Sequence, residues 1–195
     1  MRREPQFRMG RKNEQNTPSD LSFEGLSHVT APEDGVENGS RGARSDLRSK
    51  MVDITEKPRT ERSALARVRM RYPPGVLGPI MAAGGPKGPI EEVARAAGFL
   101  AAKKTPELIP MCHPLLVEHL EMELEEVEPD LLEVRFLART MGGTGVEMEA
   151  MVGAAISALT VYDMTKALDK GIRIESLELM EKRGGKSGHW RREGD

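Results

Sequence analysis

The pattern of hydrophobic and polar positions predicts strands in four parts of the chain. Residues 64–72 place apolar side chains at even positions and mostly arginines at odd positions, and Pro73-Pro74 ends this stretch. Residues 117–127 and 131–139 alternate on either side of a Glu-Pro-Asp turn, which predicts a β-hairpin. Residues 172–179 form a last predicted strand. In the hairpin, we expect two apolar sets to face each other: Leu120, Met122 and Leu124 against Leu132, Val134 and Phe136.

Two longer stretches have apolar residues at helical spacing. Residues 90–103 follow Pro89, which a helix start tolerates. Residues 146–170 are rich in Ala, Met and Val and contain no helix breaker other than Gly153. The resulting order, strand, helix, strand, strand, helix, strand, predicts an α+β domain. It is the ferredoxin-like β-α-β-β-α-β arrangement, an antiparallel sheet with helices on one face.

The first 50 residues have a different composition from the rest of the chain. They contain only seven Leu, Ile, Val or Phe residues, too few to offset the entropy of ordering. We therefore expect residues 1–50 to be a disordered or weakly ordered extension, although its basic ends leave a transit-like or docking role open. A third possibility is that the natural protein starts at Met51. The folded domain is expected over residues 51–190, followed by a polar tail at 191–195.

Charge and cysteine content narrow the function classes. With 29 Lys+Arg and 31 Asp+Glu residues the net charge is −2, which disfavours a general nucleic-acid binder. Aromatic residues are only 4%, too few for an RNA-stacking surface. A single cysteine is incompatible with an internal disulfide or a Cys-rich zinc site. Because no apolar run approaches ~20 residues, we expect a cytoplasmic protein without a membrane partner.

Several segments carry residues suited to chemistry. Two prolines fix the backbone around Cys112 and His113, although such a pair is often structural. A glycine-rich turn at 142–145 precedes Glu147 and Glu149. An ordinary turn from a strand into a helix, with acidic residues at the helix start, has the same pattern. No metal-ligand spacing is present among the histidines, so no metal site is expected.

Two acidic positions on the long predicted helix lie on the same side but far apart. Asp163 and Lys166 are three residues apart and are able to pair as ordinary surface neighbours. Glu149 and Asp163 are separated by about 21 Å at roughly 1.5 Å per residue. If both act on one small molecule, either the helix breaks between them or two subunits share a site.

Three lysines stand in glycine-containing surroundings. Lys87 lies in the loop GGPKGP, and Lys182 and Lys186 flank or occupy the segment GGKSG. That segment lacks the first glycine of a phosphate-binding loop and a following helix, which excludes a nucleotide triphosphatase of that type. A flexible lid that presents Lys182 and Lys186 to phosphate remains compatible with the pattern, as does simple solvation of all three side chains.

Taken together, four segments resemble the molybdenum cofactor biosynthesis protein C family, the cyclic pyranopterin monophosphate synthases. They occur in the family's order between Met51 and Gly188. The segments are LIPMCHPL at 108–115, TGVEMEA at 144–150, ALTVYDM at 158–164 with Lys166-Ala167 behind it, and GGKSG at 184–188.

The resemblance implies an enzyme that converts the cyclised 7,8-dihydroguanosine triphosphate intermediate into cyclic pyranopterin monophosphate and diphosphate. It also implies a homohexamer built from dimers, with the sites near the dimer interface. No cofactor is implied, although Mg²⁺ bound to the triphosphate is compatible with Glu147 or Glu149 nearby. The implied catalytic residues are Asp163, Lys166 and Lys87, and the implied substrate-binding residues are Met111, Cys112, His113, Glu147, Met148, Glu149, Lys182 and Lys186.

The residue types suit this reaction. We expect Asp163 and Lys166 to exchange protons, with the pKa of the lysine lowered by its surroundings. The lysines at 87, 182 and 186 would meet the charge of the departing diphosphate, with His113 as a donor. Many relatives have His-His where this chain has Gly85-Pro86, and a lysine where it has Gly143. Because of these departures, a second function is also considered: a non-catalytic ferredoxin-like interaction or regulatory domain.

Overall fold

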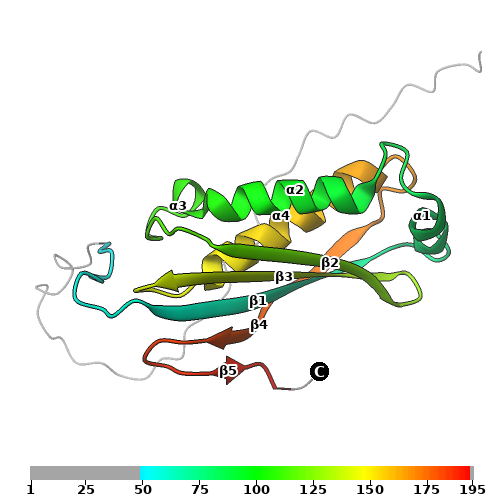
Figure 1. Cartoon of the computed structure of the whole chain (residues 1–195). Coiled ribbons are helices and arrows are strands. Elements are labelled where there is room, and N and C mark those ends of the chain that lie inside the picture. Colours follow the sequence, from blue (N-terminus) through cyan, green and yellow to red (C-terminus); the bar gives the residue numbers. More distant parts are fainter. Residues whose placement is uncertain (1–48, 194–195) are drawn as a thin grey trace, which may run out of the picture. The chain divides into compact units, whose positions relative to one another are not determined.

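The computed structural model describes residues 49–193 (Figure 1). The expectation of a disordered extension therefore falls outside the described residues, apart from positions 49 and 50. No helix within 49–193 is long and apolar enough to cross a membrane. The elements are β1 (Thr60–Arg71), α1 (Leu77–Ala83), α2 (Ile90–Lys103), α3 (Thr105–Leu108), β2 (His119–Glu128), β3 (Leu131–Gly142), α4 (Glu147–Thr165), β4 (Arg173–Arg183) and β5 (Trp190–Arg191).

The sheet has the strand order β2-β3-β1-β4-β5, and every neighbouring pair is antiparallel. Helices α2 and α4 lie side by side on one face of it (Figure 1). The succession β1-α2-β2-β3-α4-β4 is the expected β-α-β-β-α-β order, so the ferredoxin-like α+β fold is confirmed. The short helices α1 and α3 and the edge strand β5 were not expected from the pattern.

The core lies between the sheet and the two long helices. The even positions of β1, from Ala64 to Met70, are buried with the apolar residues of β3. Helix α4 crosses Phe136 at Gly153, where an added Cβ would lie only 2.4 Å from the ring carbons Cε1 and Cζ. Phe136 also makes an edge-to-face contact with Phe99 of α2, with ring centroids 5.8 Å apart. The small residues of α4 thus let the helix lie close to the sheet.

The hairpin register differs in part from the expected pairing. Met122 lies opposite Phe136 and Leu124 opposite Val134, but Leu120 faces Ala138, and Leu132 faces Glu126. Each strand thus has one apolar residue paired outside the expected set. The turn itself decides the register, because Asp130 adopts a positive φ of 59° and the pairing shifts between Glu126 and Glu128.

Several predicted element ends were wrong. Strand β1 begins at Thr60 rather than at residue 64, and β3 ends at Gly142 rather than at 139. Helix α4 ends at Thr165 rather than at residue 170, because the chain turns back there and the Asp169 carboxylate accepts a hydrogen bond from the Gly171 N–H at 2.6 Å. Strand β4 continues to Arg183 rather than ending at 179, because β1 offers partners as far as Ser63, which pairs with Arg183. Strand β5 then pairs with this polar end of β4, at the boundary between the expected domain and the expected tail.

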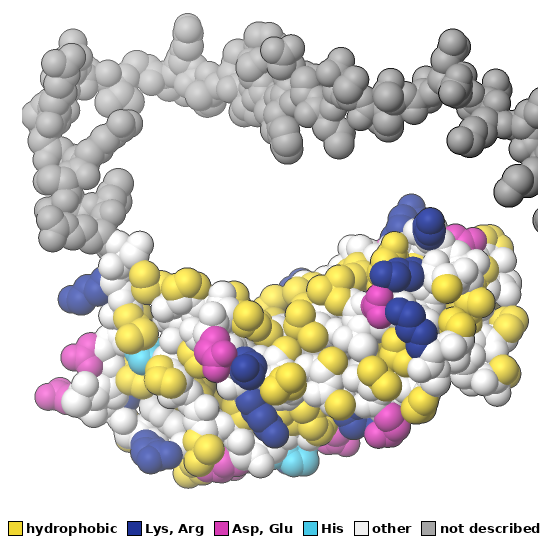
Figure 2. Space-filling view, turned by 90° about the horizontal axis from the view of Figure 1, so that it is seen from above, with side chains coloured by type: hydrophobic (Ala, Val, Ile, Leu, Met, Phe, Trp, Pro, Cys, Tyr) yellow, Lys and Arg dark blue, Asp and Glu magenta, His cyan; other side chains and the backbone are white. Residues whose placement is uncertain are grey.

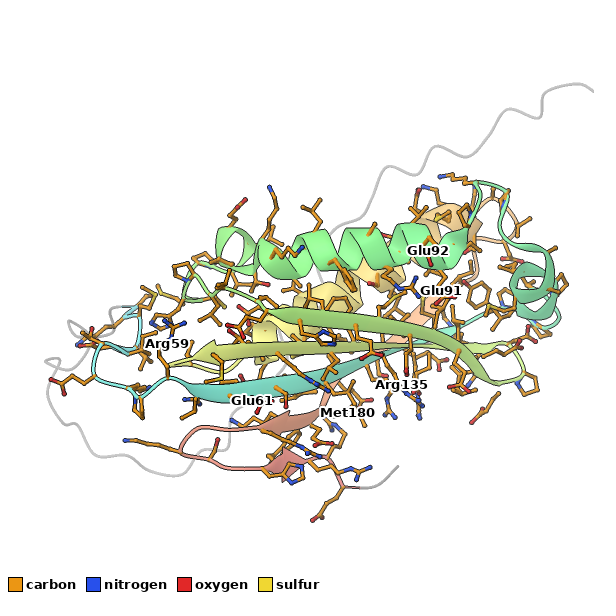
Figure 3. The ribbon with its side chains drawn as sticks, in the orientation of Figure 1. Arg59, Glu61, Glu91, Glu92, Arg135 and Met180 are labelled. Atoms are coloured by element: carbon orange, nitrogen blue, oxygen red, sulfur yellow. The ribbon has the colours of Figure 1, made fainter. Side chains whose placement is uncertain are left out.

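The face of the sheet away from the helices is charged, which explains the arginines at odd positions of β1. The buried Glu133 carboxylate accepts hydrogen bonds from Arg69 Nε at 3.1 Å and from Arg135 Nε at 2.7 Å. Figure 3 shows Arg135 and Met180 on this side. The hollow of about 630 Å³ that they help to line contains none of the predicted site residues.

Candidate active site

Two lysines converge on one carboxylate at the C-terminal end of α4. Lys166 Nζ lies 2.7 Å from Asp163 Oδ1, and Lys87 Nζ lies 2.7 Å from Asp163 Oδ2. Lys166 and Asp163 come together because they are one helical turn apart. Lys87 comes from the loop between α1 and α2, far away in sequence. The structure thus brings together the three residues that were expected to be catalytic.

The two ammonium groups change the acidity of this cluster. Two hydrogen bonds lower the pKa of Asp163 to about 2, the one from Lys166 with the larger effect and the one from Lys87 with the smaller. The same Asp163 contact raises the pKa of Lys166 above its ordinary value. The expectation of a lysine with a lowered pKa was therefore wrong for Lys166 in this protomer. The Asp163 carboxyl is therefore ionised at neutral pH, and it lies between Lys87 and Lys166.

A tight turn presents Lys87. The Gly88 N–H donates to the Gly85 carbonyl at 3.1 Å, and Gly84 and Gly88 have positive φ values of 80° and 108°. A Cβ at Gly85 would lie 2.7 Å from Cδ1 of the buried Ile90. A side chain at position 85 therefore fits only if Ile90 moves. The Gly85-Pro86 departure belongs to a turn that still directs Lys87 to Asp163.

The other predicted residues gather at the opposite, N-terminal end of α4. His113 Nε2 lies 2.7 Å from the carbonyl oxygen of Val52, which fixes the ring against the segment before β1. The adjoining hollow has a volume of about 340 Å³. Its lining includes the expected substrate-binding residues Met111, Cys112, His113, Glu147, Met148 and Glu149.

Burial raises the pKa values of two groups in this hollow, Glu149 and Cys112. The Glu149 side chain is buried, and loss of solvent raises its pKa, with a further contribution from the nearby charge of Glu147. Burial likewise raises the pKa of the Cys112 thiol, and the Glu149 charge adds to it. The thiol therefore stays protonated at neutral pH. Within 49–193, no cluster of three or more His, Cys, Asp or Glu residues is arranged to hold a metal ion.

Replacement of Glu149 by Gln is expected to stabilise the fold at pH 8 but not at pH 4. The folded protein favours the protonated carboxyl, so wild-type stability falls as the pH rises above the ordinary carboxyl pKa of 4.5. Glutamine carries no charge and avoids this loss. Urea unfolding of both proteins at the two pH values measures the difference. An equal effect at both values would show that Glu149 has no raised pKa in the folded chain.

A second hollow, of about 670 Å³, adjoins the first and shares Lys57, Thr144, Gly145 and Glu147 with it. Lys182 lines it, and its Nζ lies 2.9 Å from Glu147 Oε1. Lys182 stands on strand β4, so the expectation that a flexible loop presents it was wrong. Lys186 lies in the glycine loop beyond the strand and is exposed. Lys57 and Arg62 also line this hollow and were not predicted, because nothing in the local pattern distinguishes them from solvated charges.

The two groups of site residues do not meet within one protomer. Helix α4 is continuous from Glu147 to Thr165, so Glu149 and Asp163 remain about 21 Å apart along it. Of the two arrangements left open by the sequence, the broken helix is excluded. If the groups act on one molecule, the second group comes from another copy of the chain.

Comparison with known proteins adds independent information. The model of the MoaC family matches residues 51–185. The cyclic pyranopterin monophosphate synthase of Thermomicrobium roseum is 48% identical over 148 residues, covering 75% of this chain and 89% of the relative. The protein of the same name from Desulforamulus reducens is 48% identical over 145 residues, covering 74% and 88%. The match ends within the glycine segment at 184–188.

The two matched crystal structures are too dissimilar to this chain to support a statement about its fold. A crystal structure of AtUAH in complex with (S)-hydroxyglycine overlaps with a TM-score of 0.27 at 13% identity, covering 63% of this chain and 27% of that chain. The AtUAH complex with glyoxylate gives the same TM-score at 14% identity and the same coverage.

Proposed function

This chain belongs to the MoaC family, and we propose that it converts (8S)-3',8-cyclo-7,8-dihydroguanosine 5'-triphosphate into cyclic pyranopterin monophosphate and diphosphate. The protein is thus a lyase of molybdenum cofactor biosynthesis. One observation carries the assignment of the catalytic centre: Lys87 and Lys166, which are distant in sequence, both bind the Asp163 carboxylate at 2.7 Å. Such a cluster serves both proton transfer and binding of phosphate.

Lys166 acts as the proton donor in this proposal. Its raised pKa keeps it as an ammonium ion, so it is able to protonate a ring nitrogen or oxygen as the purine-derived ring is rebuilt. Asp163 keeps the ammonium group in position. Lys87, the other cation on the same carboxylate, stabilises negative charge that develops on the substrate.

The two hollows at the other end of α4 accept the body of the substrate. The ring system fits the smaller hollow, where Met111 and Met148 offer apolar contacts and His113 a donor. Lys182 and Lys186 border the larger hollow and bind phosphate. Rebuilding the ring and expelling diphosphate involve proton and phosphoryl transfers, so we propose that no redox cofactor takes part. Mg²⁺ bound to the triphosphate would approach Glu147 or Glu149.

A second copy of the chain would complete the site. The exposed side of α4 is apolar: Met148 is 37% and Leu159 is 51% exposed. Figure 2, which looks onto the helical side, shows hydrophobic side chains over much of this surface. Met148 is the second residue of α4 and Asp163 the third from its end, so the two lie almost equally far from the middle of the helix. Two α4 helices packed antiparallel about that middle therefore place the partner's Asp163 near Met148. We propose such dimers, assembled into a cytoplasmic hexamer.

Mixing two defective chains tests the shared site. Chains with Asp163→Asn and chains with His113→Ala and Lys182→Ala are each expected to be nearly inactive. Refolded together in equal amounts, they should recover about a quarter of wild-type activity, because half of the dimers contain one intact site of two. A mixture of Asp163→Asn with Lys166→Ala is the control and stays inactive, since both changes affect the same end. No recovery in the first mixture would contradict a site built from two copies.

The reaction itself is tested with the purified full chain. The cyclised dihydroguanosine triphosphate is supplied, and the fluorescent oxidation product of the pyranopterin and released diphosphate are followed together. Equal amounts of both products are expected. A folded, oligomeric wild-type protein that forms neither would refute the enzymatic function and favour a binding module.

A further inference from the structure

The Asp130 side chain lies at the turn between β2 and β3 and binds the backbone at the start of α1. Its Oδ2 accepts a hydrogen bond from the Gly75 N–H at 2.8 Å, and its Oδ1 accepts one from the Leu77 N–H at 3.1 Å. Val76, the N-cap residue of α1, makes no capping bond with its own side chain. Asp130 therefore supplies, from another part of the chain, the acceptor that the first turn of α1 needs.

These bonds keep the Asp130 carboxyl ionised. The hydrogen bonds from the backbone of Gly75 and of Leu77 are the largest causes that lower its pKa below the ordinary value of 3.8. Asp130 also has a positive φ of 59°, a conformation that aspartate tolerates better than most residues. A charged acceptor and an unusual backbone conformation thus coincide at this one position.

Helix α1 connects these bonds to Lys87. The helix has only seven residues, too few to be stable on their own, so contacts of its residues with the rest of the chain fix its place. Leu77 and Ile80 are buried in the core. At the other end of the helix, the Gly84 N–H donates to the Ile80 carbonyl at 2.8 Å, and the tight turn that presents Lys87 follows directly. A shift at the start of α1 therefore moves the turn that carries Lys87.

The turn at Asp130 is also connected to the C-terminal end of α4. The Tyr72 N–H donates to the Asp130 carbonyl at 2.8 Å. The buried Tyr72 hydroxyl lies 3.3 Å from Thr165 Oγ1, and it is the donor because the Thr165 proton goes to the Val161 carbonyl at 2.8 Å. Thr165 is the last residue of α4 and directly precedes Lys166. Figure 1 shows the β2–β3 turn, α1 and this end of α4 at the same end of the sheet.

We infer that Asp130 is a positioning residue of the catalytic centre: by fixing the start of α1, it holds Lys87 against Asp163. The inference rests on the proposed function. The Lys87 and Asp163 side chains are 48% and 53% exposed, so packing around them does not hold the pair together. An exposed ion pair contributes little by itself, and a small displacement of a group at the reaction centre lowers the rate strongly. The backbone that carries Lys87 must therefore be fixed from outside the pair, as the Asp130 bonds do.

Asp130→Gly tests the inference through the rate, because glycine adopts a positive φ without strain and only the carboxylate is lost. We expect kcat to fall about tenfold in the wild-type chain, but not to fall further in a chain that already carries Lys87→Ala. A residue that only supports the fold would lower kcat by the same factor in both chains. Asp130→Asn keeps one acceptor and should recover part of the loss. Glu128→Gln, which changes an exposed acid at the same turn, is the matched control and should leave kcat unchanged.

Zero-length cross-linking measures the position of Lys87 without turnover. A carbodiimide activates the Asp163 carboxyl, and Lys87 and Lys166 then compete to form an amide with it. In the wild type both amides are expected, because both Nζ atoms lie 2.7 Å from the carboxylate. In Asp130→Gly, the Lys87 amide should decrease several-fold relative to the Lys166 amide, as measured by mass spectrometry. Thermal unfolding identifies any loss of folding, and Asp130→Asn, which keeps the turn, then gives the same ratio in a folded chain.

The outcomes separate the inference from the proposed function. An unchanged ratio of the two amides and an unchanged kcat in Asp130→Gly, with normal turnover by the wild type, would overturn the inference alone. An equal loss of kcat with and without Lys87→Ala would also overturn it, since Asp130 would then not act through Lys87. A decreased Lys87 amide, in a protein whose wild type forms no product, would support the positioning of Lys87 and refute the enzymatic function.

Discussion

Asp163→Asn is expected to reduce kcat by about 10³-fold or more, since the variant loses both proton-transfer geometry and the charge that organises two lysines. In the wild type, the carboxylate accepts hydrogen bonds from Lys87 and Lys166, both at 2.7 Å. Asparagine offers one neutral acceptor oxygen and an NH₂ group that faces a cation. One lysine therefore loses its partner and its position. Steady-state measurement of product formation gives kcat and KM separately.

The fold should not change in this variant. Asp163 is about half exposed in the described chain, and exposed ion pairs contribute little to stability. Glu107→Gln is the matched control, because Glu107 forms an exposed pair with Lys104 at the same i,i+3 spacing. It should leave both kcat and the melting temperature unchanged. An Asp163→Asn enzyme with near wild-type kcat would show that the lysine cluster is not the catalytic centre.

Gly153→Ala is expected to destabilise the protein by about 2 kcal/mol, although alanine is the better helix former by ~1 kcal/mol. The new Cβ would overlap Phe136, whose ring carbons Cε1 and Cζ would be 2.4 Å away. Phe136 is fully buried and contacts Phe99 of α2, so its ring has no open space to enter. Either α4 moves away from the sheet or the ring leaves its preferred rotamer. Urea unfolding measures the loss.

Gly78→Ala provides the comparison for this core variant. Gly78 lies in helix α1, and a Cβ there would meet no atom within 4 Å outside its chain neighbours and the backbone of the helix itself. The substitution should change stability by less than about 1 kcal/mol, because the gain in helix propensity is offset by the crowding of the new Cβ against the ring of Pro79. Equal effects of the two substitutions would contradict the close contact of α4 with Phe136. Because α4 carries site residues at both ends, a shifted helix in Gly153→Ala should also lower activity.

The main elements and the reaction follow from the order of amino acids along the chain. Alternation over residues 64–72 indicates β1 because apolar side chains on one face of a strand recur at every second position. The helical spacing in residues 90–103 matches α2 at both ends. The four family segments named the reaction and most of the candidate site residues, since such segments are recognisable from local order alone. None of these inferences requires knowing which distant segments touch.

Where the elements end and which charged groups meet depend on contacts between distant parts of the folded chain. The polar end of β4 is a strand because β1 supplies hydrogen-bond partners for it, and Lys182 is thereby held beside Glu147. The pKa of Lys166 is raised by a carboxylate that also binds Lys87, a contact across the fold that local pattern does not encode. The continuous α4 separates Glu149 from Asp163, so a site that uses both residues needs a second chain. Backbone pairing and electrostatics act through space, and their outcome depends on residues far apart in the sequence.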